Sequence, residues 1–392
     1  MGRYIVMDIV FYGNSLNYDQ GSGNYQELKK ITKWDGRQYT LVSRYALRYS
    51  LLETAKKLGL WKTAEWNKLN ATGEGDVIQP ALDFLFSGEL LNYPEFDLFG
   101  YLITKPQNFR TAPVKINHAV SMTPFNYDAL FNANLGLANR MRKRFGKMSP
   151  NPFTSEEHET FYQYSIVVDV DNIGEMEVYF DKKIKFDFEG EKEWTLNDIE
   201  NEDKVRVTIK KGQKTKEIIQ TSEIEKLEFK ELNKDISLVK YGLKKDSNDD
   251  PVKKRVIELL KAILYLKRSI KGREEDISPK LIVMGVYKNN PYKTYKDKIV
   301  LLDEYVEEEY DEIEETPMEN GGRLVKVRHK TTKSRKPLFE IENVESDAKS
   351  IDEKEILKFI DPLFNSIDEC EEYEIIKIFT DASIKVKNGN QE

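Results

Sequence analysis

The sequence has very few of the residues that build metal centres and disulfides. Its 392 residues include one cysteine, Cys370, and three scattered histidines, His118, His158 and His329. One cysteine excludes an internal disulfide and a multi-cysteine zinc site, and these histidines have no metal-ligand spacing. We therefore expect neither a metal nor a cofactor.

Long apolar runs are also missing. No segment approaches the roughly 18 apolar residues that a membrane-spanning helix needs. The N-terminal MGRYIVMDIVFYGN is strand-like, is interrupted by Asp8 and has no small-residue cleavage site after it, so we do not interpret it as a signal peptide. With 39% hydrophobic and 33% charged residues, the composition predicts a soluble, cytoplasmic protein of one elaborated domain or two, with no membrane partner.

Charge is distributed unevenly along a chain whose net charge is −7. Residues 105–147 carry eight basic residues and one acid, Asp128, whereas residues 303–319 hold ten acids and no base, and residues 323–336 hold seven Lys and Arg and no acid. The last two blocks could neutralise one another in an exposed hairpin or loop, and such runs are usually solvated. Because local fields decide electrostatic binding, the basic segment keeps a nucleic-acid partner open.

Hydrophobic periodicity predicts an α+β fold. An amphipathic helix is expected from the N-cap Ser43 to Gly59, and another over residues 252–268. After residue 175, alternating Lys and Glu indicate an antiparallel, half-exposed sheet. The expected strands are 3–12, 98–104, 112–120, 162–170 and 280–287.

The start of the first helix carries two misplaced cations, Arg44 and Arg48. A helix N-terminus is partly positive and has free N–H groups, so a cation there costs roughly 0.3–1 kcal/mol. A phosphate could use the N–H groups, the Ser43 hydroxyl and Arg44 together, with Arg48 one turn on. The alternative is that the arginines reach an acidic side chain elsewhere in the fold.

The stretch FRTAPVKINHAV, residues 109–120, alternates like a strand but mixes apolar and polar groups on both faces. Period two places Arg110 and His118 on one face and Lys115 and Asn117 on the other. Pro113 cannot donate to a central ladder, so we expect an edge strand or a bulge near its start. Such a strand suits a surface that faces a polyanion.

The next segment, from Ser121 to about Pro150, interleaves aromatic and sulfur side chains with Asn and Arg. Bases of single-stranded nucleic acid stack on such side chains while phosphates meet the cations. Met122, Phe125 and Met141 are the base-stacking candidates. An alternative for the apolar subset is that a helix packs onto the core through Leu130, Phe131, Leu135 and Leu137; the basic cluster at 140–147 is expected in a loop.

Four motifs in this order resemble one protein family. LVSRYALRYSLL after a Gly/Asn-rich loop, then DLFGYL, APVKINHAVSMTP and HETFYQYSIVVDVDNIGE, resemble the DevR branch of the Cas-seven proteins, the backbone subunits of type I CRISPR surveillance complexes, with subtype I-B the expected one. The resemblance covers residues 1–175 and, less fully, 252–287. It implies a ferredoxin-like, RNA-recognition-type palm with an inserted β-rich finger and a thumb.

The resemblance also implies a function and a division of the chain. The protein would be a non-enzymatic subunit that binds CRISPR RNA, oligomerises along it with other copies of itself and other Cascade subunits, and presents it to target DNA in antiviral defence. The palm would span 1–120, 151–175 and 252–290, the thumb 121–150, a charged β-rich insertion 176–250, and a charged insertion with C-terminal elements 291–392. The expected RNA-binding residues are Asn14, Asn17, Ser43, Arg44, Arg48, Arg110, Lys115, Asn117, His118, Ser121, Arg140, Arg142 and Lys143.

Other functions remain open from the sequence. An RNA endonuclease, as in related type III subunits, would have to rest on Asp128 or His118, and neither a carboxylate cluster nor a second general catalyst is visible beside them. A DNA-binding regulator would need a groove-reading motif, and none is found. A protein-binding scaffold would show no salt-dependent RNA binding.

Overall fold

A computed structural model describes most of the chain. The described residues are 2–72, 77–246, 249–302, 305–317, 323–335, 338–344, 346–365 and 371–387. Cys370 lies outside them, as do residues 303–304, 318–319 and 336 of the charged blocks. None of the helices in these ranges is long and apolar enough to cross a membrane.

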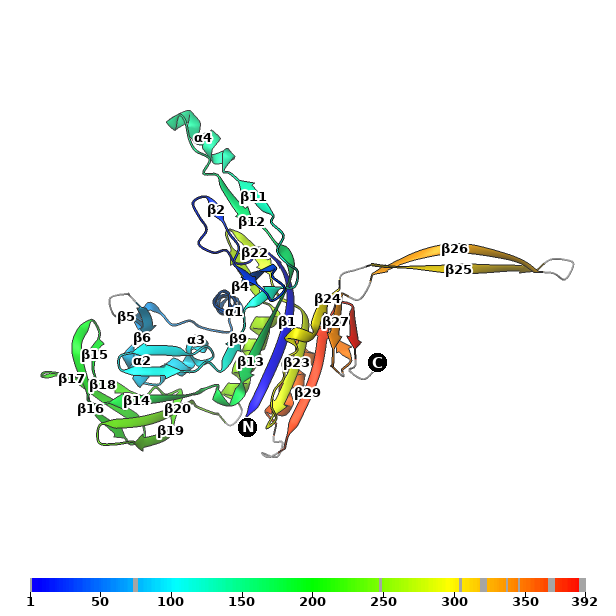
Figure 1. The fold of residues 1–392 in the computed structure, drawn as a ribbon. Coiled ribbons are helices and arrows are strands. Elements are labelled where there is room, and N and C mark those ends of the chain that lie inside the picture. Colours follow the sequence, from blue (N-terminus) through cyan, green and yellow to red (C-terminus); the bar gives the residue numbers. More distant parts are fainter. Residues whose placement is uncertain are drawn as a thin grey trace.

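An antiparallel sheet with two helices on one face forms the centre of the molecule (Figure 1). Strand β1 (Arg3–Asn14) pairs with β13 (Glu159–Asp169) on one side and β23 (Pro279–Lys288) on the other. On its other edge β13 pairs with β9 (Val114–Ile116) and β10 (Ala119–Ser121). With α1 (Arg44–Lys57) and α5 (Pro251–Leu264) in the crossovers, this is the βαββαβ order of a ferredoxin-like fold, so the α+β prediction is confirmed.

Both faces of this palm sheet are covered, which explains why β1 is buried almost throughout. Ile5, Met7 and Ile9 point to the side where α1 and α5 pack, in a core that includes Leu51 and Leu259. On the opposite face, Val10 of β1 belongs to a separate apolar cluster with residues of a small C-terminal sheet. That sheet consists of β24 (Ile299–Leu301), β27 (Phe339–Glu342) and β30 (Ile384–Lys387).

The palm sheet continues beyond these strands at both edges. At one edge β23 pairs with β29 (Tyr373–Thr380), which pairs with β28 (Ala348–Lys349). At the other, β10 pairs with β4 (Gln38–Val42), which pairs with β3 (Lys30–Thr32). Helix α6 (Glu353–Ile360) contributes Ile356 and Phe359 to the helix-side core.

A second lobe has a core of its own, made from two distant segments. Residues 82–103 and 176–243 share one hydrophobic cluster that contains Phe84, Phe86, Val178 and Tyr241. Its sheets pair β14–β20–β19 and β15–β16–β17–β18. Residues 82–96 and Ile103 therefore pack with the β-rich insertion, whereas Leu98 and Phe99 pack in the palm core. The sequence placed the whole segment with the palm. The elements of this lobe are α2 (Leu82–Phe86), α3 (Pro94–Asp97), β7 (Tyr101–Thr104), β8 (Gln107–Arg110), β14 (Glu175–Asp181), β15 (Lys185–Phe188), β16 (Glu191–Asn201), β17 (Val205–Lys211), β18 (Lys214–Ile219), β19 (Ile224–Glu231) and β20 (Ile236–Leu243).

Two extensions project from the body (Figure 1). The first, the arm, is a ribbon of β11 (Ala129–Asn132) and β12 (Phe153–Glu156) with α4 (Leu135–Phe145) at its tip and β2 (Tyr25–Gln26) beside β12. The second pairs β25 (Tyr305–Pro317) with β26 (Arg323–Arg335), with Glu312 opposite Arg328. Lys330 Nζ lies 2.6 Å from Glu312 Oε2. Over the described residues, the hairpin interpretation of the acidic and basic blocks is confirmed.

Two further hairpins complete the strands of the structure. They are β5 (Leu69–Thr72) with β6 (Val77–Pro80), and β21 (Lys267–Ile270) with β22 (Arg273–Asp276). The predicted ends of α1 are both confirmed. Ser43 Oγ accepts a hydrogen bond from the Ala46 amide at 3.2 Å, and Gly59 follows the helix with a φ of +69° that disfavours a side chain.

Candidate nucleic-acid interface

Four of the predicted residues meet at the N-terminus of α1. The Ser43 amide donates to Asn17 Oδ1 at 2.9 Å, and the Arg44 amide donates to His118 Nδ1 at 2.9 Å. These contacts join the loop after β1, the helix start and the turn between β9 and β10. Because a helix leaves its first amides without partners, Asn17 and His118 act as caps that fix the position of Arg44.

The same contacts change the expected role of the helix N-terminus. The sequence predicted that the amides of Ser43 and Arg44 donate to a phosphate, but both already have acceptors inside the protein. Burial, with help from the cations Arg44 and Lys296, lowers the pKa of His118, so its ring is neutral at pH 7 and can accept. An anion at this site would therefore meet the Arg44 side chain rather than those two amides.

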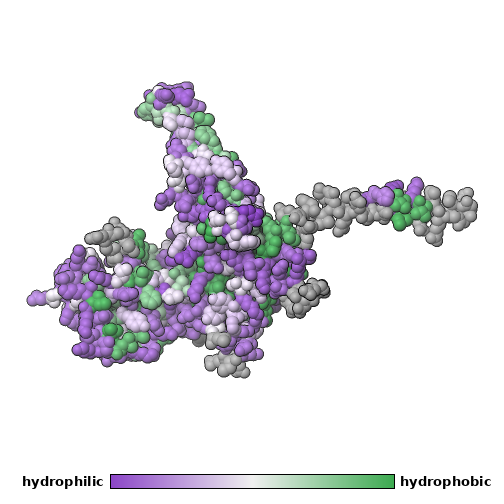
Figure 2. Space-filling model, viewed as in Figure 1, coloured by the Kyte–Doolittle hydropathy of each residue, from purple (hydrophilic) through white to green (hydrophobic). Residues whose placement is uncertain are grey.

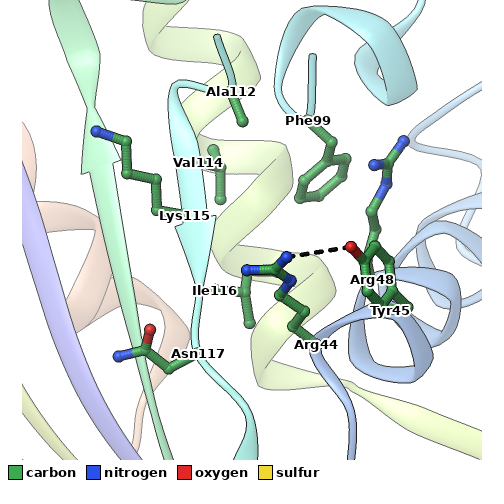
Figure 3. Close-up of a pocket in the computed structure, with 9 residues that line it drawn as sticks. All are labelled: Arg44, Tyr45, Arg48, Phe99, Ala112, Val114, Lys115, Ile116 and Asn117. Atoms are coloured by element: carbon green, nitrogen blue, oxygen red, sulfur yellow. Dashed lines mark hydrogen bonds between the residues drawn. The ribbon is translucent and has the colours of Figure 1, made fainter. Parts of the chain in front are cut away.

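Arg44 and Arg48 lie on one wall of an open cavity of about 430 Å³. Figure 3 shows the Arg44 guanidinium donating to the Tyr45 hydroxyl, a contact of 3.1 Å. Arg44 is exposed, whereas Arg48 is half-buried, with its guanidinium carbon 5.1 Å from the centre of the Phe99 ring. Arg44 is thus the more accessible cation of the pair, and Tyr45, exposed beside it, adds an aromatic surface that the sequence analysis missed although it sits in the same motif.

The other wall comes from β9. Lys115 and Asn117 are exposed, and in Figure 3 their side chains point away from Arg44, on the far side of the strand. Cations therefore flank both sides of β9, and the Asn117 amide lies on the side of Lys115. This arrangement can hold consecutive phosphates and riboses of a strand that crosses the edge of the palm.

The continuous strand predicted at 112–120 is wrong. The chain forms β9 and β10, both paired with β13, and the Asn117 amide donates to the Ser165 carbonyl at the break between them. Pro113 lies before β9, and β9 pairs only with β13 among the described strands, so the expected edge position is confirmed. Arg110 belongs to a separate hairpin strand, β8, and is not on a shared face with His118.

Arg110 is used inside the protein. Its Nη2 lies 2.7 Å from Asp97 Oδ1, and its Nε donates to the Asp97 carbonyl at 3.0 Å. Arg255 binds the other carboxylate oxygen of Asp97 at 2.7 Å. The Arg110 side chain is only 8% exposed and Asp97 is fully buried. The prediction that Arg110 faces RNA phosphate is therefore contradicted, because this guanidinium neutralises a buried carboxylate.

Ser121 and Asn14 also have internal partners. Ser121 is fully buried, and its hydroxyl accepts from the Thr40 amide and donates to the Thr123 carbonyl. Asn14 Oδ1 accepts from Ser15 Oγ at 2.6 Å. Ser121 therefore cannot meet RNA directly, and Asn14 is left partly buried beside the loop that carries Asn17.

The basic cluster expected in a loop is instead the helix α4 at the tip of the arm. Asn134 caps it by accepting from the Leu137 amide at 3.2 Å. Arg140, Arg142 and Lys143 are exposed on this helix, and Met141 is half-buried. We call the residues that meet at the N-terminus of α1, which are Asn17, Ser43, Arg44 and His118, the α1 cluster. Helix α4 presents its cations far from this cluster (Figure 1).

Met122 and Phe125 lie at the base of the arm. Met122 packs against the C-terminal cluster. The Phe125 ring has the Lys30 ammonium 4.7 Å from its centre and the His158 ring 5.6 Å away. Both side chains are half-buried, so only part of each is available for a base.

The apolar residues of the arm do not pack onto the core, so the helix-packing alternative is wrong. Their exposed fractions are 54% for Leu130, 72% for Phe131, 59% for Leu135 and 47% for Leu137. Figure 2 shows hydrophobic surface along the arm among polar residues. An exposed apolar surface of this kind commonly marks a contact with another molecule.

The candidates for cleavage chemistry lie apart in the fold. Asp128 precedes β11 on the arm, and its carbonyl accepts from the Glu157 amide at 3.0 Å. His118 lies between β9 and β10 with Nδ1 already accepting from Arg44. Among the described residues no three His, Cys, Asp or Glu side chains are grouped to hold a metal ion.

Comparisons with known proteins were made by sequence and by fold. The family model described as "CRISPR-associated negative auto-regulator DevR/Csa2" matches residues 5–310. The chain is 24% identical over 168 residues to "CRISPR-associated protein Cas7/Cst2/DevR" of Myxococcus xanthus (strain DK1622), a match that covers 37% of this chain and 50% of that protein. The chain therefore spans about half the length of this curated relative.

Solved structures of CRISPR complexes are also similar at low identity. A chain of a "CRISPR RNA-guided surveillance complex, pre-nicking" has a TM-score of 0.40 at 12% identity, with 74% of this chain and 80% of that chain covered. A chain of a "CRISPR RNA-guided surveillance complex" has a TM-score of 0.35 at 10% identity, with 74% and 72% covered. Since the family model matches more than three quarters of the sequence, the chain belongs to the DevR/Csa2 family of CRISPR-associated proteins.

Proposed function

We propose that this protein is a CRISPR RNA-binding backbone subunit, which oligomerises along the guide and presents it for pairing with target DNA in a Cascade-like complex. Membership of the DevR/Csa2 family supports the CRISPR context. The observation that carries the RNA-binding part is the junction at the α1 N-terminus, where Asn17 and His118 fix Arg44 beside an open cavity. Subtype I-B stays a prediction.

A single strand fits this surface better than a duplex. The exposed groups Arg44, Tyr45, Lys115 and Asn117 are spread along the edge of the palm, and the basic helix α4 lies away from them at the tip of the arm. Cations next to an aromatic ring suit phosphates with unstacked bases between them. This argues against the DNA-binding regulator that the family description suggests.

Assembly along the guide is assigned to the arm. It combines the cations of α4 with exposed apolar residues such as Phe131, and it stands clear of its own body (Figures 1 and 2). A surface that its own chain does not cover can serve a neighbouring copy, and repetition of one such head-to-tail contact builds a filament. The apolar part would bind protein and the basic part would follow the guide.

The proposed subunit is not a nuclease. Asp128 and His118 are on different elements, and positioned phosphates alone give no base, acid or metal for cleavage. Incubation of labelled guide and complementary RNA with magnesium or manganese should leave both intact. Regular cuts that disappear in the Asp128→Ala variant would contradict this part of the proposal.

Direct binding of single-stranded RNA tests the proposal. Affinity should exceed that for a duplex DNA of equal length, and its logarithm should fall linearly with the logarithm of salt concentration. Arg44→Ala should reduce the slope by about 0.7, the value for one phosphate contact on a single strand. Equal slopes for the two proteins, both folded, would show that the α1 cluster does not hold RNA.

A further inference from the structure

A second cavity, with mixed polar and apolar lining, lies on the opposite face of the palm sheet from α1 and α5. It has a volume of about 290 Å³. Its floor is formed by β10, by Met122 after it and by Gln163 of β13, and β24 supplies one wall. Two cations, Lys33 and Lys296, complete the lining, and none of the lining residues is acidic.

Gln163 gives the cavity an unused hydrogen-bond donor. Its side chain points to this face because its neighbours Tyr162 and Tyr164 are in the helix-side core. Gln163 is only 8% exposed, and its amide nitrogen has no hydrogen-bond partner in the described structure. A buried donor without a partner is unfavourable, so a ligand that accepts from it would recover this loss.

The two lysines lie close enough to oppose each other's charge. Burial lowers the pKa of Lys33, and the nearby ammonium of Lys296 lowers it further. Lys33 contacts the Tyr39 ring, 3.8 Å from its nitrogen to the ring centre, and Lys296 is exposed. Two neighbouring cations without an acid between them favour an anion.

Two carboxylates whose charges act on these lysines, Asp35 and Asp8, already have donors. Asp35 accepts from Arg37 and from the Tyr39 hydroxyl. Asp8 is fully buried beneath η4 (Lys296–Lys298) and accepts from the Tyr295 amide at 2.6 Å and from Ser165. Neither Asp35 nor Asp8 lines the cavity, so Lys33 and Lys296 face it without a carboxylate among the lining residues.

We propose that this cavity holds a phosphate group of the RNA strand, with Lys33 and Lys296 as its counter-charges and the Gln163 amide as a donor. The inference rests on the proposed function. The lining residues Val120, Ser121 and Met122 follow His118 by two to four positions, so the chain connects the cavity to the α1 cluster. An RNA strand that leaves Arg44 would reach the second cavity by following β10.

The first experiment measures RNA binding of the full chain across a salt series. Lys33→Gln with Lys296→Gln should weaken binding of single-stranded RNA about tenfold, as loss of a charge-assisted contact does, and lower the salt slope by about 0.7. The matched control, Lys192→Gln with Lys234→Gln, removes two exposed lysines of the second lobe and should leave the slope near that of the wild type. Equal salt slopes in the two double variants would overturn the phosphate site. The Arg44→Ala measurement tests the proposed function independently of that result.

Gln163→Leu separates binding from folding. The substitution removes an unpaired donor at similar size, so resistance to urea should be kept or rise, whereas RNA affinity should fall with the salt slope unchanged. A structural role alone would lower stability and leave the affinity of the folded fraction intact. That result would exclude Gln163 from the site.

Acylation of lysine amines, read by mass spectrometry, distinguishes the sources of phosphate. We expect stoichiometric single-stranded RNA to protect Lys33 and Lys296, and inorganic phosphate to protect them only at much higher concentration. Protection by inorganic phosphate alone would overturn the assignment to the RNA strand, and protection by neither would overturn the anion site. The inorganic phosphate arm does not depend on RNA binding, so it judges the cavity even if the proposed function fails.

Discussion

Replacement of Arg110 should destabilise the protein without a specific effect on RNA binding. In the Arg110→Gln variant the fully buried Asp97 loses one of its two guanidinium partners and keeps Arg255 and the Gly174 amide, which donates to Oδ1 at 2.9 Å. The Asn172 carbonyl also loses its donor, at 2.6 Å. Removing one partner from a buried ion pair costs about 3–5 kcal/mol.

The expected cost lies at the lower end of that range, about 3 kcal/mol, because Arg255 still neutralises Asp97. Asp97→Asn should cost more, since it leaves Arg110 and Arg255 buried around a neutral group. Urea unfolding with linear extrapolation measures both values. Arg44→Ala is the matched control, because removal of this exposed guanidinium should change the free energy of unfolding by at most about 0.5 kcal/mol.

The opposite pattern would refute this reasoning. If Arg110→Gln unfolded like the wild type but lowered the salt slope of RNA binding as Arg44→Ala does, then Arg110 would be a surface contact. The internal assignment of its guanidinium, and with it the correction to the sequence prediction, would then be wrong.

Two further predictions concern pH and assembly. Burial raises the pKa of Asp8 above its usual value of 3.8, so the folded state binds this proton more tightly than the unfolded state, and the resulting stability is present at low pH and lost as pH rises through the raised pKa. The side-chain amide of the Asp8→Asn variant can still accept from Tyr295 and donate to Ser165, so this variant should not lose stability as the pH rises. Urea midpoints that fall equally with pH in the variant and the wild type would contradict this prediction. Replacing residues 133–152 by an Asn-Gly turn between Asn132 and Phe153, which pair across the arm, should leave a folded protein that binds RNA without forming ordered multimers in electron micrographs, and normal multimers would exclude the arm from assembly.

The sequence predicted the elements whose signals are local. Strand β1 and helices α1 and α5 carry strong periodicity, and all three are observed. Helix α5 ends at Leu264, four residues before the predicted end, because β21 begins at Lys267. Helix α4 was mistaken for a loop because its apolar residues are few and interleaved with Asn and Arg. Its caps, Asn134 and Gly146, were the available signal.

Contacts between segments that are distant in the chain could not be predicted from the sequence. The partnership of Arg110 with Asp97 and Arg255 depends on how three segments fold together, and no spacing rule predicts it. Lys296 lies 178 positions after His118 in the chain, yet its charge reaches that ring in the structure. The residues of the α1 cluster were predicted individually, but their use as caps on one another appears only in three dimensions.

We propose that this protein holds CRISPR RNA within an assembly of several copies. Purification of the tagged protein from cells that also express its genomic neighbours, followed by sequencing of the bound RNA, tests this claim most directly. We predict RNA of discrete length that contains repeat-derived sequence, in a complex with several copies of this chain for each RNA. A monomer without RNA, or one bound to heterogeneous cellular RNA, would contradict the account.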